Sequence, residues 1–232
     1  MANVKYGGGI VQMSGSLGGN TYARNRFGNY VRARTTPVNP NTARQIAIRA
    51  ALAELTARWS ATVTAAQRTA WDLYAASVAM KNKLGETIYL TGFNHYIRSN
   101  TPRLQASVAV VDAGPTTFEL PEQDPTFAIT ASEAAQEISY TFNDALAWAN
   151  EVGGFLFKYQ GQPQNPQRNY FSGPWRYHGN IIGAVSPPSS PDAEGSPPYV
   201  FTELQRQWCY GRIALADGRL SEPFRADTFC AA

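Results

Sequence analysis

The stretch EISYTFNDALAWANEVGGFLFKY, residues 137–159, decides the fold of the C-terminal half of this chain. Apolar residues alternate with polar ones at its start, and aromatic residues recur at every second position near its end. A period of two residues is typical of β-strands, whose side chains point alternately to opposite faces. We therefore expect strands at residues 137–142 and 154–159. The residues that share a face are Ile138, Tyr140 and Phe142 in the first strand and Phe155, Phe157 and Tyr159 in the second.

The rest of this half has the same texture of short runs separated by proline and glycine. Seven short strands in all is the number typical of a β-sandwich. The run 186–198 is too polar and too rich in proline for a strand, so we expect an exposed loop there. The sequence thus predicts an antiparallel β-sandwich over residues 105–232. The five further candidate strands are residues 127–130, 177–185, 199–203, 208–216 and 224–228.

Residues 37–104 carry helical signals. The segment 37–42 supplies proline stops and an asparagine cap with proline at the first helical position, and apolar residues then recur at helical intervals. A Thr64-x-x-Gln67 capping box opens a second helix, and the short connection predicts an antiparallel helical hairpin. A third short helix is a candidate at 91–97. The apolar positions are Ile48, Leu52, Leu55 and Trp59, then Trp71, Tyr74, Ala75 and Val78, then Phe93 and Ile97.

The first 36 residues are predicted to form an extended arm, because their many glycines add backbone entropy that a compact fold must remove. Two runs with strand periodicity flank Phe27-Gly28-Asn29, a candidate turn, so we expect a β-ribbon with its arginines on one face. Like charges along one face repel, and such a stripe needs an acidic or anionic partner. The stripe consists of Tyr22, Arg24, Arg26, Tyr30, Arg32 and Arg34.

The charge of the chain is unevenly distributed. The formal net charge is +3, but residues 1–105 contain 13 Lys+Arg and 3 Asp+Glu, whereas residues 106–232 contain 7 and 14. Residues 1–53 hold Lys5 and six arginines with no acidic residue. Arginine suits bidentate hydrogen bonding to carboxylate or phosphate. Two interpretations stay open: the arm binds nucleic acid, with Tyr22, Phe27 and Tyr30 as stacking platforms, or it inserts into a neighbouring protein subunit that presents acids.

Motifs that would indicate an enzyme are missing from the sequence, and we predict a non-enzymatic protein without cofactor or metal. The glycine-rich pieces match neither a dinucleotide nor a P-loop motif. We interpret His95 and His178 as packing residues, since no nucleophile motif lies near them. Cys209 and Cys230 allow one bridge at most, and the favoured interpretation is one small buried thiol and one cysteine in the C-terminal tail.

Localisation signals are equally sparse. No apolar run approaches the roughly 18 residues that a membrane span needs, and glycines interrupt the N-terminal segment where a secretion signal would have its apolar core. The aromatic residues of the sandwich leave open a third function, carbohydrate binding through its loops, although such residues more often form a core.

An ordered set of motifs runs through residues 15–100: Tyr30-x-Arg32-x-Arg34-x-x-Pro37-x-Asn39-Pro40-x-Thr42-x-x-Gln45, then Leu55-x-x-x-Trp59, then Thr64-x-x-Gln67-Arg68-x-x-Trp71. It resembles a family of bacteriophage and prophage proteins. Residues 208–215 and 217–221 are similar to the last hairpin of immunoglobulin-like or fibronectin type III modules, without the paired cysteines of true immunoglobulin domains. The resemblance implies a structural protein of the phage particle, in which head decoration or minor capsid, neck and tail locations remain alternatives.

The expected fold is therefore α+β: an extended arm with a β-ribbon (1–36), a helical hairpin (37–104) and an immunoglobulin- or fibronectin III-like antiparallel sandwich (105–232). We expect a homo-oligomer that also contacts capsid, portal or neck, or tail proteins in a virion assembled in the host cytoplasm. Nucleic acid is the alternative partner, and no membrane is expected. The predicted partner-binding residues are Tyr22, Arg24, Arg26, Tyr30, Arg32, Arg34 and Arg44.

Overall fold

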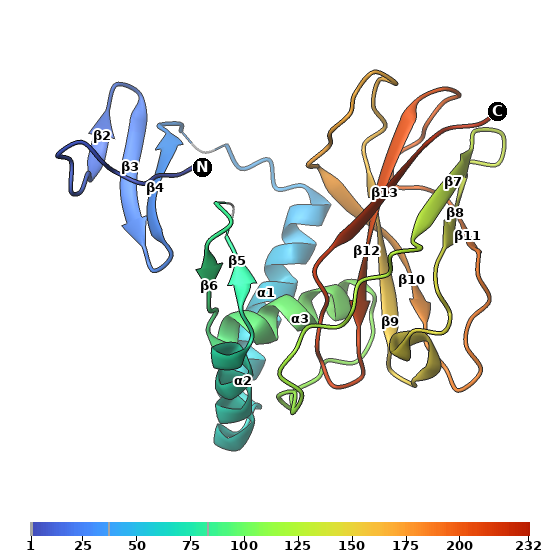
Figure 1. Cartoon of the computed structure of the whole chain (residues 1–232), viewed down its shortest axis with the longest axis horizontal. Helices are drawn as coiled ribbons and strands as arrows, with labels where there is room; N and C mark the ends of the chain where they lie inside the picture. Colours follow the sequence, from blue (N-terminus) through green and yellow to red (C-terminus); the bar gives the residue numbers. More distant parts are fainter. Residues whose placement is uncertain (1, 37, 83) are drawn as a thin grey trace.

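The computed structural model describes residues 2–36, 38–82 and 84–232 and confirms a mixed α+β fold. Figure 1 shows three parts in chain order: a small N-terminal sheet, a helical unit, and a C-terminal β-sandwich on which the helical unit packs.

The N-terminal segment forms a four-stranded antiparallel sheet, so the expectation of an extended arm was wrong. The predicted ribbon is its central hairpin, but Asn25 pairs with Gly28, which makes Arg26-Phe27 the turn instead of Phe27-Gly28-Asn29. Gly18 and Gly19 both have positive φ and form a two-residue turn that folds the preceding strand back onto this hairpin. The glycines thus make turns instead of keeping the chain extended. The strands are β1 (Ala2–Asn3), β2 (Gly15–Leu17), β3 (Asn20–Asn25) and β4 (Gly28–Ala33), in the order β1-β4-β3-β2.

The helical unit contains α1 (Ala43–Ala61), α2 (Ala65–Ser77) and α3 (Gly92–Gln105), with a short hairpin of β5 (Met80–Lys81) and β6 (Thr87–Ile88) between the last two. The Thr64–Gln67 capping box is confirmed. For α1, however, the cap is Thr42 and not Asn39 before Pro40, because the Thr42 side chain accepts from the Gln45 N–H while the Gln45 side chain accepts from the Thr42 N–H. Pro37 lies outside the described residues.

The third helix organises this unit. It is longer than predicted and continues through Pro102, because its C-terminal turns are held by tertiary contacts; Asn100, for example, exchanges hydrogen bonds with the backbone of Val111. Both α1 and α2 pack on α3 and make little direct contact with each other, so the expectation that these two helices pack antiparallel on one another was wrong; α3 lies against both and joins them in a three-helix unit. The shared core consists of Leu55, Val63, Trp71, Tyr74, Val78 and Tyr96.

The C-terminal half forms two antiparallel sheets, with orders β10-β9-β12-β13 and β11-β8-β7. Most of the predicted strands are confirmed, with two corrections. Residues 199–203 are not a strand, and the expected loop 186–198 contains an edge strand, β11, that pairs with β8. The prolines flank β11 without interrupting it, which is why composition concealed it. The strands are β7 (Ala128–Ser132), β8 (Glu137–Thr141), β9 (Phe155–Gly161), β10 (Trp175–Ile182), β11 (Asp192–Gly195), β12 (Arg206–Ala214) and β13 (Phe224–Phe229).

The four-stranded sheet is covered on both faces, and every residue of β9 is buried. Ile138, Tyr140 and Leu156 belong to the core between the two sheets. The aromatic face predicted for β9 is confirmed, but Phe155, Phe157 and Tyr159 belong to a second core on the side of the helical unit. The molecule thus has three layers: helices, four-stranded sheet and three-stranded sheet. Cys209 and Cys230 are both free and buried in the sandwich.

The packing of the 3-10 helix η1 (Ala147–Asn150) against the end of β10 gives a testable prediction. A Cβ added at Gly183 would overlap the Trp148 carbonyl oxygen and lie 2.7 Å from the Glu151 carbonyl oxygen. We expect Gly183→Ala to lower the free energy of unfolding by about 2 kcal/mol, since overpacking against backbone forces it to shift. Urea unfolding monitored by tryptophan fluorescence measures this.

A matched control is Gly195→Ala, because a Cβ at Gly195 would meet no atom within 4 Å. Equal stability losses in the two variants would show that the close packing of Gly183 against η1 is not what the substitution disrupts.

Candidate interaction surface of the N-terminal sheet

The register of the β3–β4 hairpin places the predicted arginines on opposite faces. Tyr22 pairs with Val31 and Arg24 with Asn29, whereas Arg32 pairs with Thr21. Directly paired residues in an antiparallel ladder point to the same side of the sheet. Arg24 therefore lies on one face and Arg32 on the other, and the expectation of a single arginine face was wrong. The two-residue turn causes this, because it pairs even-numbered residues of β3 with odd-numbered residues of β4.

Two shallow depressions lie on this sheet. The larger, of about 540 Å³, is lined by Val4, Tyr22 and Val31 and also by Arg32. A smaller one of about 250 Å³, which shares Arg32 with the first, brings Arg32 and Arg34 together with the hydroxyl-bearing Ser16 and Thr21. Ser16 and Thr21 share a hydrogen bond of 2.9 Å across the β2–β3 pair. The larger depression offers apolar contact next to an arginine, and the smaller one suits a carboxylate or phosphate group.

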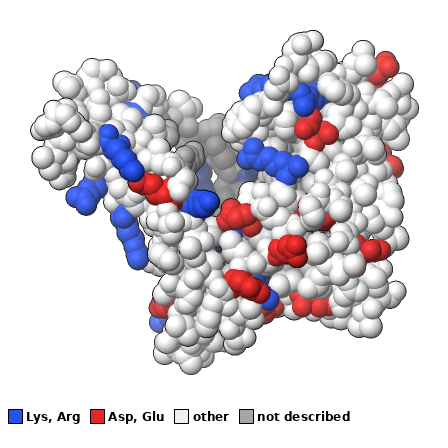
Figure 2. Space-filling view, in the orientation of Figure 1, with Lys and Arg blue, Asp and Glu red and all other residues white. Residues whose placement is uncertain are grey.

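None of the described residues of the sheet, 2–36, is buried, and four of its arginines are exposed. Within the described part of the chain, the side chains of Arg24, Arg26, Arg32 and Arg34 have no ion-pair or hydrogen-bond partner. Figure 2 shows basic side chains over this sheet, whereas most acidic side chains on the same view lie over the helical unit and the sandwich. The sheet therefore presents positive charge that the described residues do not neutralise.

The remaining basic residues of the first 53 positions are used within the chain. Lys5 pairs with Glu86 of the β5–β6 hairpin at 2.5 Å, which connects the sheet to the helical unit. The Arg44 guanidinium donates to the Trp175 carbonyl oxygen at 2.6 Å and links α1 to β10. Arg44 thus lies apart from the other predicted partner-binding residues and already has an acceptor.

The predicted stacking residues are only partly accessible. All three, Tyr22, Phe27 and Tyr30, are half-buried. Tyr22 pairs with Val31 and Tyr30 with Ala23, so the two tyrosines lie on opposite faces of the sheet. They cannot form one continuous row of stacking platforms between the arginines.

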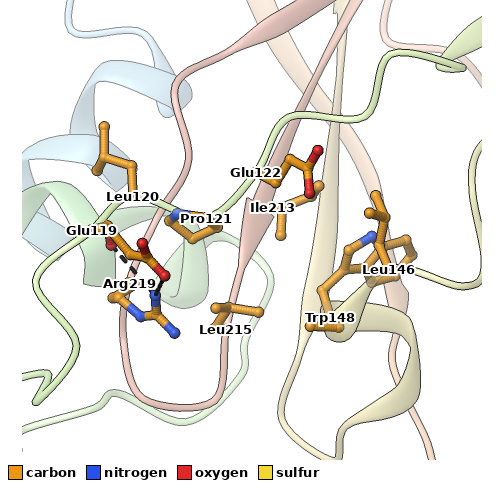
Figure 3. Close-up of a pocket in the computed structure, with 10 residues that line it drawn as sticks. Glu119, Leu120, Pro121, Glu122, Leu146, Trp148, Ile213, Leu215 and Arg219 are labelled. Carbon is orange, nitrogen blue, oxygen red and sulfur yellow. Dashed lines mark hydrogen bonds and ion pairs between the residues drawn. The ribbon is translucent and has the colours of Figure 1, made fainter.

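A pocket that the sequence did not indicate lies where the segment before β7 crosses the sandwich (Figure 3). It has a volume of about 180 Å³; Glu122, Leu146 and Trp148 are among the residues that line it. Arg219 and Glu119 form an ion pair of 3.9 Å at one end. The carboxylates of Glu119 and Glu122 come from one loop, and Glu119 is paired with arginine, so the pocket has no obvious acid–base pair.

His95 is buried in the helical unit, and His178 is half-buried in the sandwich. His95 is fully buried against the edge of Tyr74, with ring centroids 5.1 Å apart, and burial together with the charge of Arg98 lowers its pKa to about 4. His178 contacts the Tyr140 hydroxyl at 2.7 Å through Nδ1, and burial also lowers its pKa. Among the described residues, no group of His, Cys, Asp and Glu side chains is arranged to hold a metal ion, and no helix is long and apolar enough to span a membrane.

The sequence matches no protein-family model, and no similar sequence was found among curated proteins. The functional argument therefore rests on the residues and the fold.

Proposed function

We propose that this chain is a non-enzymatic structural subunit of a bacteriophage particle. The N-terminal sheet and the helical unit anchor it to neighbouring subunits of the head, neck or tail, and the sandwich is displayed outward. The observation that carries the proposal is a sheet without a core of its own that exposes four unpaired arginines. A small sheet of this kind gains stability mainly by packing against a partner.

The chemistry of the sheet favours a protein partner over nucleic acid. The larger depression combines apolar contact at Val4, Tyr22 and Val31 with one arginine, Arg32, and its apolar part has no counterpart in a phosphate backbone. The smaller depression offers two arginines, a geometry suited to carboxylates of a neighbouring subunit. Further apolar side chains are exposed on and just before α1: Val38, Ile46 and Leu52. They extend the proposed contact from the sheet to the helical unit.

We further propose that the sandwich is immunoglobulin- or fibronectin III-like. The sandwich has seven strands, four in one sheet and three in the other, which supports this assignment. The strand orders of the two sheets are β10-β9-β12-β13 and β11-β8-β7. Modules of this architecture serve many functions, so the assignment adds to the proposal of a displayed module only by analogy.

The test is incorporation into particles made by the phage or prophage that encodes the chain. We expect Arg32→Glu/Arg34→Glu to reduce incorporation at least tenfold, because reversed charges repel the acidic partner. The matched control is Arg168→Glu/Arg176→Glu, which makes the same charge change at exposed positions of the sandwich. Normal incorporation of the first variant, or equal loss in both, would contradict an anchor at this sheet.

Nucleic-acid binding remains the second candidate, since the same arginines could contact phosphates. Four phosphate contacts would make DNA affinity fall about a hundredfold between 50 and 200 mM salt. A fall of that size, abolished by Arg32→Glu/Arg34→Glu and not by the control pair, would replace the protein-partner proposal with nucleic-acid binding.

A further inference from the structure

Lys158 occupies an unusual place in the sandwich. It lies on β9 with its side chain directed into the space between the two sheets, and its side chain is 0% exposed. Lysine is almost never fully buried unless its charge is paired. The partners are two carboxylates on the opposite sheet: Nζ lies 2.5 Å from Oδ2 of Asp192 and 2.6 Å from Oε2 of Glu194.

The two carboxylates are directed inward by the register of β11. Asp192 pairs with Tyr140 and Glu194 with Ile138, and both of these partners are fully buried. The Tyr140 ring lies beside the amine, with Nζ 5.0 Å from its centroid. The Tyr140 hydroxyl in turn contacts two further ionisable side chains, the ring of His178 and the thiol of Cys209. One amine therefore faces two carboxyl groups between the two sheets, beside the aromatic ring of Tyr140.

The amine of Lys158 and the two carboxyl groups are placed as the reactants of an amide-forming condensation would be. An amine and a carboxyl group fixed in contact react as if at an effective concentration of about 10⁵ to 10⁸ M, which favours amide formation over the separate groups. A second carboxyl group within hydrogen-bonding distance of the same nitrogen can carry the proton that the reaction must move.

We propose that Lys158 and Asp192 form an intramolecular amide bond. The amine of Lys158 attacks Cγ of Asp192, the new N–C bond forms, and one carboxylate oxygen leaves as water. Starting from the ammonium and carboxylate forms, the products are one amide and one water, with no oxidant, reductant or cofactor. Glu194 accepts a first proton from the ammonium, which makes the amine a nucleophile, and delivers it to the departing oxygen; it then carries the second proton from the nitrogen to the same oxygen, which leaves as water, and so returns to its original state.

Glu194 occupies the space beside Gly179, at a bulge in β10, where a Cβ added at Gly179 would lie 2.5 Å from Oε2. We assign the acyl role to Asp192 and the role of proton carrier to Glu194, and the variants below distinguish the two. Both carboxylates are about one third exposed, which gives the released water a path to the surface.

The proposed bond would join β9 to β11 and thus one sheet of the sandwich to the other. The chain has no disulfide among its described residues, since both cysteines are free. An inter-sheet amide would supply the covalent connection that a disulfide provides in related architectures, and would resist reducing conditions. This inference does not depend on the partner of the N-terminal sheet.

The test is the intact mass of the purified full-length protein, measured after denaturation. We expect a mass lower than that of the sequence by one water molecule, and a proteolytic digest in which the peptides containing Lys158 and Asp192 are joined. Asp192→Asn is expected to lose one ammonia instead of one water, which identifies the acyl donor. Glu194→Gln is expected to form the bond at least tenfold more slowly after refolding.

The control is Lys158→Met, which keeps the length of the side chain but has no amine; its mass should equal that of its sequence. A wild-type protein with the full sequence mass would show a plain ion pair and overturn the proposal. So would a water loss that persists in Lys158→Met, since it would come from another residue. Unchanged kinetics in Glu194→Gln would overturn the role of Glu194.

Discussion

Replacing Arg103 by methionine is expected to lower the free energy of unfolding by about 3 kcal/mol, because buried carbonyl oxygens lose their charged hydrogen-bond donor. Arg103 is buried at the C-terminal end of α3, and its guanidinium donates to the carbonyl oxygens of Leu215 at 2.6 Å and Gly153 at 3.2 Å. It also lies over the Phe155 ring, 5.1 Å from the centroid. Methionine fills similar space but leaves these buried carbonyl groups without a donor.

This substitution tests whether the helical unit and the sandwich unfold as one body. Arg103 joins α3 to two turns of the sandwich, so its loss should lower the stability of both layers together. Urea unfolding followed by tryptophan fluorescence and by circular dichroism should give coincident transitions, both shifted to lower urea. Arg24→Met, at an exposed position without a partner, is the control and should leave the midpoint unchanged. Separate transitions for the two probes would show that the two layers unfold independently, and a midpoint equal to that of the control would show that the Arg103 contacts do not contribute to stability.

Much of the fold could be predicted because local periodicity reports the faces of an element. The alternation of Phe155, Phe157 and Tyr159 defined a buried face of β9, and the Thr64–Gln67 box defined the start of α2. Periodicity does not say what covers a face. Nothing in the sequence indicated that the aromatic face of β9 would pack on the helical unit, because that contact depends on residues far apart in the chain, such as Gln105 and Tyr159.

The sequence predicted which residues lie on the surface of the N-terminal sheet, but not which face of the sheet each residue occupies. The arginines and tyrosines were found from charge and alternation, but the face on which each lies depends on the turn. A turn of two residues instead of three changes the register by one and moves one arginine set to the opposite face. Propensity favoured Phe27-Gly28-Asn29, because that segment contains glycine and asparagine whereas Arg26-Phe27 contains neither.

Lys158 was missed for a related reason. A lysine between aromatic residues in a buried strand is itself a signal, but its carboxylate partners lie in a proline-rich segment whose composition is typical of an exposed loop. Only the pairing of β11 with β8 directs Asp192 and Glu194 inward. A buried charge in a strand should therefore prompt a search for an unassigned edge strand that supplies its counter-charge.

The pH dependence of stability should depend strongly on His95. In the folded protein, burial and the positive charge of Arg98 lower the pKa of His95 to about 4, whereas in the unfolded chain it is about 6.5. Between these values the unfolded state binds a proton that the folded state does not, so stability falls as the pH decreases. A difference of about 2.5 pKa units corresponds to about 3 kcal/mol, present in full at pH 7 and mostly lost by pH 4.

His95→Phe isolates this contribution, since phenylalanine keeps the edge contact with Tyr74 and cannot be protonated. We expect the variant to lose about 3 kcal/mol less than the wild type between pH 7 and pH 4, measured by urea unfolding at each pH. Both ring nitrogens of His95 are buried without a hydrogen-bond partner, so the replacement should cost little at pH 7. His178 also has a lowered pKa and remains in both proteins, so its contribution cancels in the comparison. If the free energies of unfolding of the two proteins changed equally with pH, the pKa of His95 would be the same in the folded and unfolded states. Water would then reach the His95 ring in the folded protein.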